Sequence, residues 1–224
     1  TAYTFDNITG LGDETVTIAD TTIDAALLIT LDAHTTGLIN AATVTTLTGT
    51  AAAIIHLFNG PGIQGITGLG EEDITLTGTI TVAQFNTIAA STTGAITATI
   101  SEGDISSLNA ITGTGNALTI TVTDASVAAA DLNTLDAKTI VAINAGTITA
   151  LTGATAELNT VFNAYAAGTI TGLGNEAVTI SDTTIDAALL ITLDAHTSGI
   201  IDASTITTLT GSDADKATVK ASSG

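Results

Sequence analysis

Two long stretches of this chain have nearly the same sequence. Residues 8–50 read ITGLGDETVTIADTTIDAALLITLDAHTTGLINAATVTTLTGT, and residues 170–212 read ITGLGNEAVTISDTTIDAALLITLDAHTSGIIDASTITTLTGS. Only nine of the 43 aligned positions differ, and the exchanges are mild, such as Val44 for Ile206. Self-similarity at a fixed offset is the signature of a repeat architecture, so this duplication decides how the rest of the chain is interpreted.

Weaker copies of the same pattern fill the region between the two stretches. Residues 66–93 begin again with ITGLG, and residues 119–139 and 140–168 carry related strand-like and helix-like segments. Aligning them predicts a single array over residues 1–224, with eight repeats that begin near residues 8, 37, 63, 94, 116, 140, 169 and 199. We number these repeats 1 to 8 and expect residues 219–224 to form a flexible tail.

Each repeat combines a segment with strand periodicity and a segment with helix periodicity. Residues 15–18, with the sequence TVTI, alternate threonine with aliphatic residues, which suits a strand with one buried face and one wet face. Ile23, Leu27 and Leu31 then recur at i, i+4 and i+8, which predicts that they line the buried face of a helix.

The residues between these segments are typical of helix ends. Residues 21–24, with the sequence TTID, resemble a capping box, and Thr50 and Ser126 are candidate helix N-caps. Glycine follows three of the predicted helices, where a left-handed C-cap residue is expected; these glycines are Gly37, Gly94 and Gly199.

One strand-plus-helix repeat cannot bury its own apolar face, but stacked repeats can. We therefore predict a repeat solenoid of strand-plus-helix units, an α/β solenoid in which parallel strands stack as in a β-helix and short helices stack beside them. An open α/β layered domain is the alternative fold.

The charge balance excludes several classes of function. The net charge is −19, with three lysines and no arginine, so the surface repels nucleic acid and anionic lipid. The chain has no cysteine, and no run of about 18 apolar residues that would insert into a membrane. It also has no nucleophile elbow, and we interpret it as a non-enzyme without a required cofactor.

Acidic residues in the glycine-rich turns are the candidate calcium ligands, because hard cations bind clustered carboxylate and carbonyl oxygens. The candidates are Asp13, Glu14, Glu71, Glu72, Asp73 and Glu176. The alternative interpretation, which we favour, is that these are ordinary turns whose glycines supply positive φ angles.

Pairs of threonines separated by one residue form the second candidate site. Stacked strands would place them about 6.7 Å apart along a strand and about 4.8 Å apart between strands, an array that can order water and bind ice. The predicted face consists of Thr43, Thr45, Thr79, Thr81, Thr97, Thr99, Thr147, Thr149, Thr205 and Thr207. Threonine is also the soluble strand former of an outer face, and we favour that interpretation.

Several segments resemble the tandem repeats of very large secreted or cell-surface proteins of marine bacteria, notably cyanobacteria. The segments that carry the resemblance are residues 20–23, 31–37, 41–49, 132–139 and 156–161. The resemblance implies an adhesin, matrix or surface-layer component with an extracellular or cell-surface location. The nonapeptide calcium repeat G-G-x-G-x-D of neighbouring regions in such proteins is missing here.

These observations lead to one expected function and two alternatives. We expect a structural or adhesive repeat module that self-assembles end to end, with itself or with neighbouring repeats as its partner. Residues 3–5 look like a further strand and the last repeat stops within its helical stretch, so further repeats or copies would cover both ends. The alternatives are an ice- or surface-binding protein and a calcium-stabilised surface-layer module.

Overall fold

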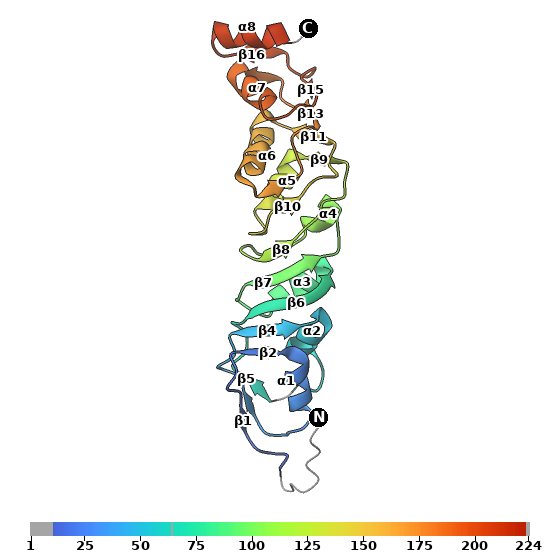
Figure 1. Cartoon of the computed structure of the whole chain (residues 1–224), viewed down its shortest axis with the longest axis vertical. Helices are drawn as coiled ribbons and strands as arrows, with labels where there is room; N and C mark the ends of the chain where they lie inside the picture. The colour runs from blue at the N-terminus through green and yellow to red at the C-terminus, as the bar shows by residue number, and fades with distance from the viewer. Residues whose placement is uncertain (1–10, 64, 223–224) are drawn as a thin grey trace. The chain divides into compact units, whose positions relative to one another are not determined.

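The computed structural model describes residues 11–63 and 65–222 and is an α/β fold without a closed barrel in that part of the chain (Figure 1). It contains sheets of parallel strands and eight helices among the described residues. The helices are α1 (Ala25–Asp32), α2 (Ala51–Asn59), α3 (Val82–Ala89), α4 (Ile105–Leu108), α5 (Ala129–Asp136), α6 (Thr155–Ala167), α7 (Ala187–Asp194) and α8 (Asp213–Ser222). None of these helices is long and apolar enough to span a membrane.

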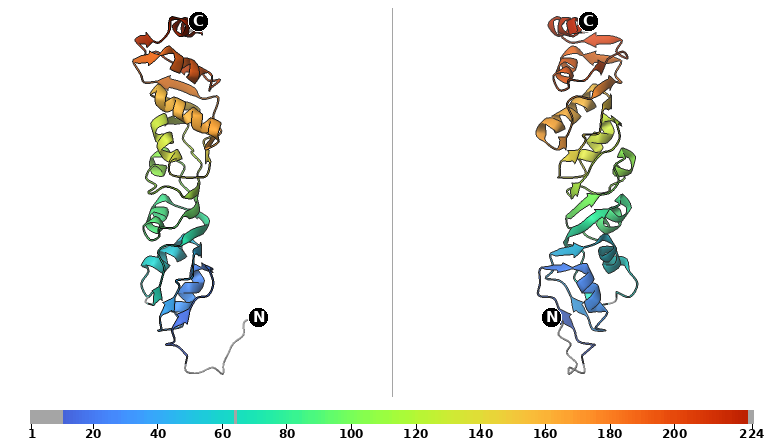
Figure 2. Two further views of the ribbon diagram at one scale, coloured as in Figure 1. Left: turned by 90° about the vertical axis from the view of Figure 1, so that its left-hand side faces the viewer. Right: turned by 45° about the vertical axis from the view of Figure 1, so that its right-hand side comes forward.

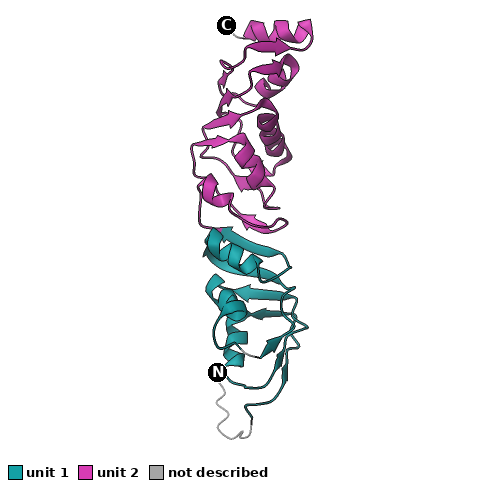
Figure 3. Cartoon of the chain, turned by 180° about the vertical axis from the view of Figure 1, so that it is seen from behind, with its two compact units in different colours: residues 1–99 teal, residues 100–224 magenta. Residues whose placement is uncertain are grey.

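The contacts divide the chain into two compact units, residues 1–99 and 100–224, where the sequence predicted one array (Figure 3). The strands of the first unit are β1 (Val16–Thr17), β2 (Thr22–Asp24), β3 (Ile39–Asn40), β4 (Thr46–Gly49), β5 (Ile66–Thr67), β6 (Asp73–Ile80) and β7 (Ile96–Ile100). They form a sheet in the order β1-β3-β5 and a second sheet in which β2, β4, β6 and β7 are successive neighbours.

The second unit also contains parallel strands, but they are grouped into different sheets. Its strands are β8 (Ala117–Thr119), β9 (Ser126–Ala128), β10 (Ile143–Asn144), β11 (Ala150–Gly153), β12 (Ile170–Thr171), β13 (Ala177–Ile180), β14 (Thr184–Asp186), β15 (Ile201–Asp202) and β16 (Thr208–Thr210). Strand β10 pairs with β12, β14 pairs with β16, and β9, β11, β13 and β15 form a four-stranded sheet. These pairs are parallel, so each strand meets its partner after a helix-containing crossover.

Each of the eight predicted repeats contains one or more strands followed by one helix. The beginning of repeat 1 near residue 8 lies outside the described residues. Residues 219–222, which we expected in a flexible tail, are instead helical and form the end of α8, while residues 223–224 lie outside the described part.

The strands owe their two faces to the alternation seen in the sequence. In β7, Ile96, Ala98 and Ile100 are buried while Thr97 and Thr99 are exposed. Within the first unit, the helices α2 and α3 lie on one side of the strands β4 and β6 (Figure 2). Both layers contribute buried aliphatic residues, such as Leu47 of β4 and Ile54 of α2. Successive helices pack against one another in both units, α1 on α2 in the first and α6 on α7 in the second.

The predicted buried face of the first helix is wrong. Ile23 lies in β2, and α1 begins only at Ala25, because the carboxylate of Asp24 is itself the N-cap and accepts the N–H of Ala26 at 2.8 Å. With the helix starting later, Ala25 and Leu28 point into the core, whereas Leu27 is 64% exposed. The capping box proposed for residues 21–24 is wrong for the same reason.

Of the other two cap predictions, one is confirmed and one is wrong. Thr50 caps α2 by accepting the N–H of Ala53 at 3.2 Å, so that prediction is confirmed. Ser126 belongs to strand β9, and the N-cap of α5 is Ala128, whose side chain cannot accept a hydrogen bond. The prediction for Ser126 is therefore wrong.

The glycines that follow the helices have a different role from the one predicted. Gly37, Gly94 and Gly199 do not adopt positive φ angles. A Cβ atom at these positions would lie 2.1, 2.2 and 1.9 Å from the backbone oxygens of Glu14, Glu72 and Glu176 respectively. Glycine is required there because the backbone of one repeat touches the backbone of the previous repeat.

Candidate functional site: glycine-rich turns and threonine rows

Three glycine-rich turns fold back on their own glutamate side chains. Oε2 of Glu14, Glu72 and Glu176 accepts the N–H of the glycine two residues earlier, at 2.6, 2.8 and 2.8 Å. The side chains of Glu72 and Glu176 are buried, with exposed fractions of 2% and 0%. In the turn of repeat 3, Gly68 has a φ angle of 84°, which supports the interpretation of these segments as turns with positive-φ glycines.

Each of these turns accepts hydrogen bonds from the loop that follows the next helix in the chain. The hydroxyl groups of Thr35, Thr92 and Thr197 donate to the carbonyl oxygens of Glu14, Glu72 and Glu176, at 3.2, 2.7 and 3.1 Å. The backbone N–H of the next residue in each loop also donates to a turn glycine, as Thr93 does to Gly70 at 2.9 Å. The same joint is thus built three times, from the same residue types.

The calcium candidates do not come together as one site. They lie in three different repeats, and within the described residues no group of three or more His, Cys, Asp or Glu side chains is placed to hold a metal ion. Oε1 of Glu176 is buried without a hydrogen-bond partner in the described part of the chain, but a lone carboxylate oxygen does not make a calcium site.

The carboxylate of Glu14 makes the stability of its turn depend on pH. The backbone N–H of Gly12 stabilises the ionised form of Glu14, and this lowers the pKa of Glu14 below its ordinary value. A carboxylate with a lowered pKa in the folded state contributes stability above the pKa of the unfolded chain, and this contribution is lost as the pH falls through the folded pKa. The turn of repeat 1 is therefore weakened by acid and not by alkali.

We expect Glu14→Gln to flatten the pH dependence of stability between about pH 5 and pH 3, because the variant keeps an acceptor for Gly12 but has no charge to lose. The measurement is urea unfolding, followed by circular dichroism, at a series of pH values. The matched control is Asp13→Asn, which removes one charge from the same turn without touching this hydrogen bond. An equal flattening in both variants would contradict the role given to Glu14.

Six of the ten predicted face threonines hold neighbouring repeats together. Their hydroxyl groups donate to backbone carbonyl oxygens 24 or 25 residues earlier in the chain. The pairs are Thr43 with Ile18 (2.5 Å), Thr45 with Thr21 (3.2 Å), Thr147 with Val122 (2.5 Å), Thr149 with Ala125 (3.0 Å), Thr205 with Ile180 (2.7 Å) and Thr207 with Thr183 (3.1 Å). These threonines precede the strands and do not lie on them.

The remaining predicted threonines have two different environments. Thr81 caps α3 in a capping box with Gln84, whereas Thr79, Thr97 and Thr99 are exposed on β6 and β7. The predicted face is thus not one surface in the structure.

A different set of threonines forms a row on the sheet, and only Thr97 of this row belongs to the predicted face. Thr48 of β4 pairs with Thr75 of β6, and the hydrogen bond from Ile74 N–H to the oxygen of Ala95 places Thr75 beside Thr97. Their common signal is a threonine flanked by aliphatic or glycine residues inside a strand, in contrast to the turn threonines, which come just before a strand.

We expect Thr205→Val to lower the free energy of unfolding by about 1 kcal/mol, because it removes the donor to the oxygens of Ile180 and Asp182 while keeping the shape of the side chain. Thr179→Val on the exposed face of β13 is the control and should change it by less than about 0.5 kcal/mol. Chemical unfolding of both variants measures the difference, and equal values would show that the inter-repeat bond contributes nothing.

The comparisons with known proteins give no relative for this chain. No protein-family model, no curated protein and no solved structure matches it.

Proposed function

We propose that this chain is a non-catalytic structural or adhesive repeat module of an extracellular or cell-surface protein. Its eight repeats wind as an α/β solenoid, and it joins further repeats end to end. The observation that carries the proposal is the recurring joint between repeats, in which threonine hydroxyl groups donate to the carbonyl oxygens of the preceding repeat at a separation of 24 or 25 residues.

The composition of the core supports this proposal. The buried residues are mostly leucine, isoleucine, valine and alanine from strand and helix segments of each repeat, and they complete a core only when neighbouring repeats are in contact. The backbones of neighbouring repeats touch at Gly37, Gly94 and Gly199, so a residue with a side chain does not fit at these positions. The net charge of −19 counteracts lateral aggregation of a strand-rich surface.

Small-angle X-ray scattering at low protein concentration tests the proposal. A compact domain of this length has a radius of gyration of about 17 Å. A solenoid gives a distinctly larger value, with the scattering profile of an elongated particle. A value near 17 Å at a measured mass of one chain would reject the solenoid and, with it, the role as an extended module.

The row formed by Thr48, Thr75 and Thr97 favours a second candidate function, the binding of ice or of another crystalline surface. The three side chains lie on adjacent strands, which are spaced about 4.8 Å apart. Thermal hysteresis of the purified chain, compared with the variant Thr75→Lys, tests it. Hysteresis near zero in the unmodified chain would reject this candidate.

A further inference from the structure

We propose that the outer edge of β16 in one copy of this chain pairs, in parallel, with the outer edge of β1 in a second copy. The proposal rests on the proposed function and names the surface through which the module joins the next one. It predicts the register Thr208 with Thr15, Leu209 with Val16, Thr210 with Thr17 and Gly211 with Ile18.

The chain already contains this joint twice. In the first unit β4 pairs with β6, with Leu47 opposite Ile74, and in the second unit β11 pairs with β13, with Leu151 opposite Val178. In both joints a strand with the sequence Leu-Thr-Gly meets a strand that directly follows a G-L-G-x-E turn. Because both joints have the same sequence pattern and the same register, an L-T-G strand and a strand that follows a G-L-G-x-E turn are the two partners that such a joint requires.

A third copy of each partner is present at the two outer edges. Residues 208–211 have the sequence TLTG, identical to residues 46–49 of β4. Residues 15–18 have the sequence TVTI and follow a G-L-G-x-E turn, as residues 73–76 and 177–180 do. Among the described residues, β16 pairs only with β14, and β1 pairs only with β3. The third pair of partners therefore lacks its joint within the described chain.

Burial shows that the face of repeat 8 is incomplete. In repeat 2, Ile39, Ala41 and Leu47 are each 0% exposed, because repeat 3 covers them. The residues at the same positions of repeat 8 are partly exposed although their sequence is the same; they are Ile201, Ala203 and Leu209. Beside them lies an open cavity of about 370 Å³, lined by residues of α7, of the segment 199–203 and of α8.

The opposite face of repeat 1 is incomplete in the same way. Val178 of β13, which pairs with β11, is 1% exposed, whereas Val16, its equivalent in β1, is partly exposed. On the neighbouring helix, Leu27 is 64% exposed, compared with 45% for Leu189, whose helix is packed against α6. Val16 and Leu27 are thus both more exposed than their equivalents in repeat 7, as expected where no preceding repeat covers them in the described part of the chain.

Backbone groups on these edges are oriented to form the joint. In the joint of β4 with β6, the N–H of Asp73 donates to the oxygen of Thr45 at 3.0 Å. The equivalent groups in the proposed joint are the N–H of Thr15 and the oxygen of Thr207. In β1, Val16 and Ile18 donate to repeat 2, so the alternate N–H of Thr17 points to the opposite edge.

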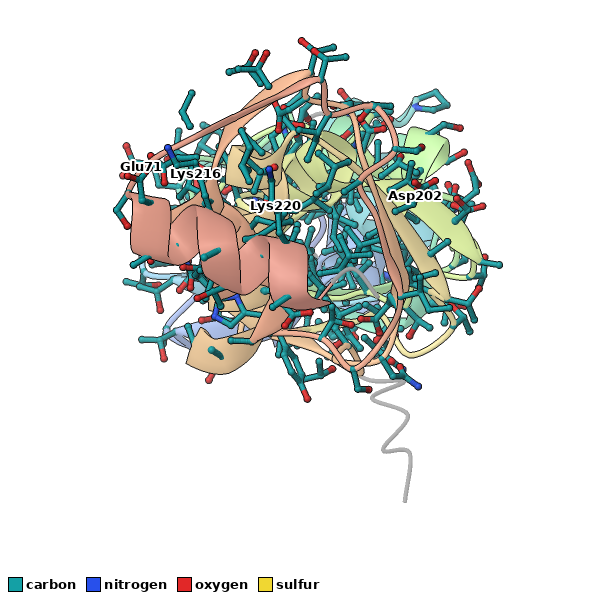
Figure 4. The ribbon with its side chains drawn as sticks, turned by 90° about the horizontal axis from the view of Figure 1, so that it is seen from above. Glu71, Asp202, Lys216 and Lys220 are labelled. Carbon is teal, nitrogen blue, oxygen red and sulfur yellow. The ribbon has the colours of Figure 1, made fainter. Side chains whose placement is uncertain are left out.

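Helix α8 would take part in a head-to-tail contact. It carries Lys216 and Lys220, two of the three lysines of the chain (Figure 4), and Lys216 is paired with Asp213 of the same helix at 2.9 Å. It follows β16 as α2 follows β4, and α2 packs against the helix of the next repeat. In the proposed joint α8 therefore faces α1 of the second copy, which is capped by Asp24 and ends at Asp32.

Cysteine crosslinking tests the register, because the chain has no cysteine of its own. Thr15→Cys and Thr208→Cys are prepared as separate variants, mixed at micromolar concentration and oxidised. Opposed residues on paired strands lie within the distance that a disulfide spans, so we expect a covalent dimer of about 44 kDa, twice the 22.0 kDa chain mass, that reducing agent removes. The mixture of Thr17→Cys with Thr208→Cys is the control, since two residues out of register places the Cα atoms about 8 Å apart.

A second measurement does not depend on cysteines. Sedimentation velocity of the unmodified chain should show species larger than one chain that grow with concentration. Thr17→Pro, which removes the outward N–H, should abolish them, and Thr17→Val should keep them. Circular dichroism establishes that each variant is folded.

The outcomes separate this inference from the proposed function. A dimer of the in-register mixture, with at least a several-fold lower yield from the control, supports the joint. A single-chain mass at all concentrations together with no crosslink overturns the joint, while a large radius of gyration in the same sample leaves the solenoid intact. Equal crosslinking in both mixtures also overturns the proposed register.

Discussion

The variant Leu28→Ala should lower the free energy of unfolding by about 3 kcal/mol, whereas Leu27→Ala should change it by less than about 0.5 kcal/mol. The two leucines are neighbours in α1, but Leu28 is 0% exposed and Leu27 is 64% exposed. Removing the buried side chain costs its transfer free energy and leaves a cavity between α1 and the strands. Both substitutions give alanine in a helix, so helix propensity affects them equally.

Urea unfolding followed by circular dichroism measures this difference. The pair Leu190→Ala and Leu189→Ala in α7 repeats the experiment in the second unit, where Leu190 is 9% and Leu189 is 45% exposed. There we expect the same order with a smaller gap. A larger effect of Leu27→Ala than of Leu28→Ala would show that α1 buries the face expected from the sequence, at i, i+4 and i+8.

Gly94→Ala should be about as damaging, with a loss of about 3 kcal/mol in the free energy of unfolding. A methyl group there would lie 2.2 Å from the backbone oxygen of Glu72 and 2.6 Å from the backbone nitrogen of Asp73. Neither atom belongs to a side chain that can rotate away, so the two repeats must separate or the turn must deform. The same distortion should also weaken the hydrogen bond from the hydroxyl of Thr92 to the carbonyl oxygen of Glu72.

Gly146→Ala is the matched control for Gly94→Ala. Its added methyl group would meet only Oδ1 of Asn144, at 3.3 Å, and its φ angle is not positive. Repeat 2 carries Ala42 and repeat 8 carries Ser204 at the corresponding position, so a side chain fits there. We expect a change below about 1 kcal/mol. Hydrogen exchange of the amides in residues 70–76 and 92–96 should accelerate in the first variant and not in the control.

Local patterns in the sequence predicted that strand and helix segments alternate along the chain. Alternation of threonine with aliphatic residues predicted a strand at residues 15–18, where Val16 and Thr17 form β1, since a pleated strand sends alternate side chains to opposite faces. Thr50 was recognisable as a helix cap because a cap depends on groups only three residues away. Duplication of residues 8–50 and 170–212 predicted the repetition of strand and helix without reference to any distant contact.

Tertiary contacts decided what each repeated residue does. Thr43 and Thr97 have the same strand propensity, yet the hydroxyl of Thr43 donates to Ile18 and the side chain of Thr97 is exposed on β7. A propensity describes the backbone of a residue and its near neighbours, whereas the partner of this hydroxyl group lies 25 residues away. The sequence could therefore place threonines in the repeats but could not divide them between joint and surface.

The same limit explains the helix face and the glycines. Successive residues of a helix are rotated by about 100° from one another, so α1 buries Leu28 and leaves its neighbour Leu27 exposed. A glycine after a helix suggested a left-handed cap. Glycine is instead required at Gly37 because the carbonyl oxygen of Glu14, in the preceding repeat, leaves no room for a Cβ atom. By itself the sequence determined that strand and helix segments repeat along the chain, because this follows from periodicity. Only the tertiary structure decided which atoms touch between repeats, because those contacts join residues more than twenty positions apart.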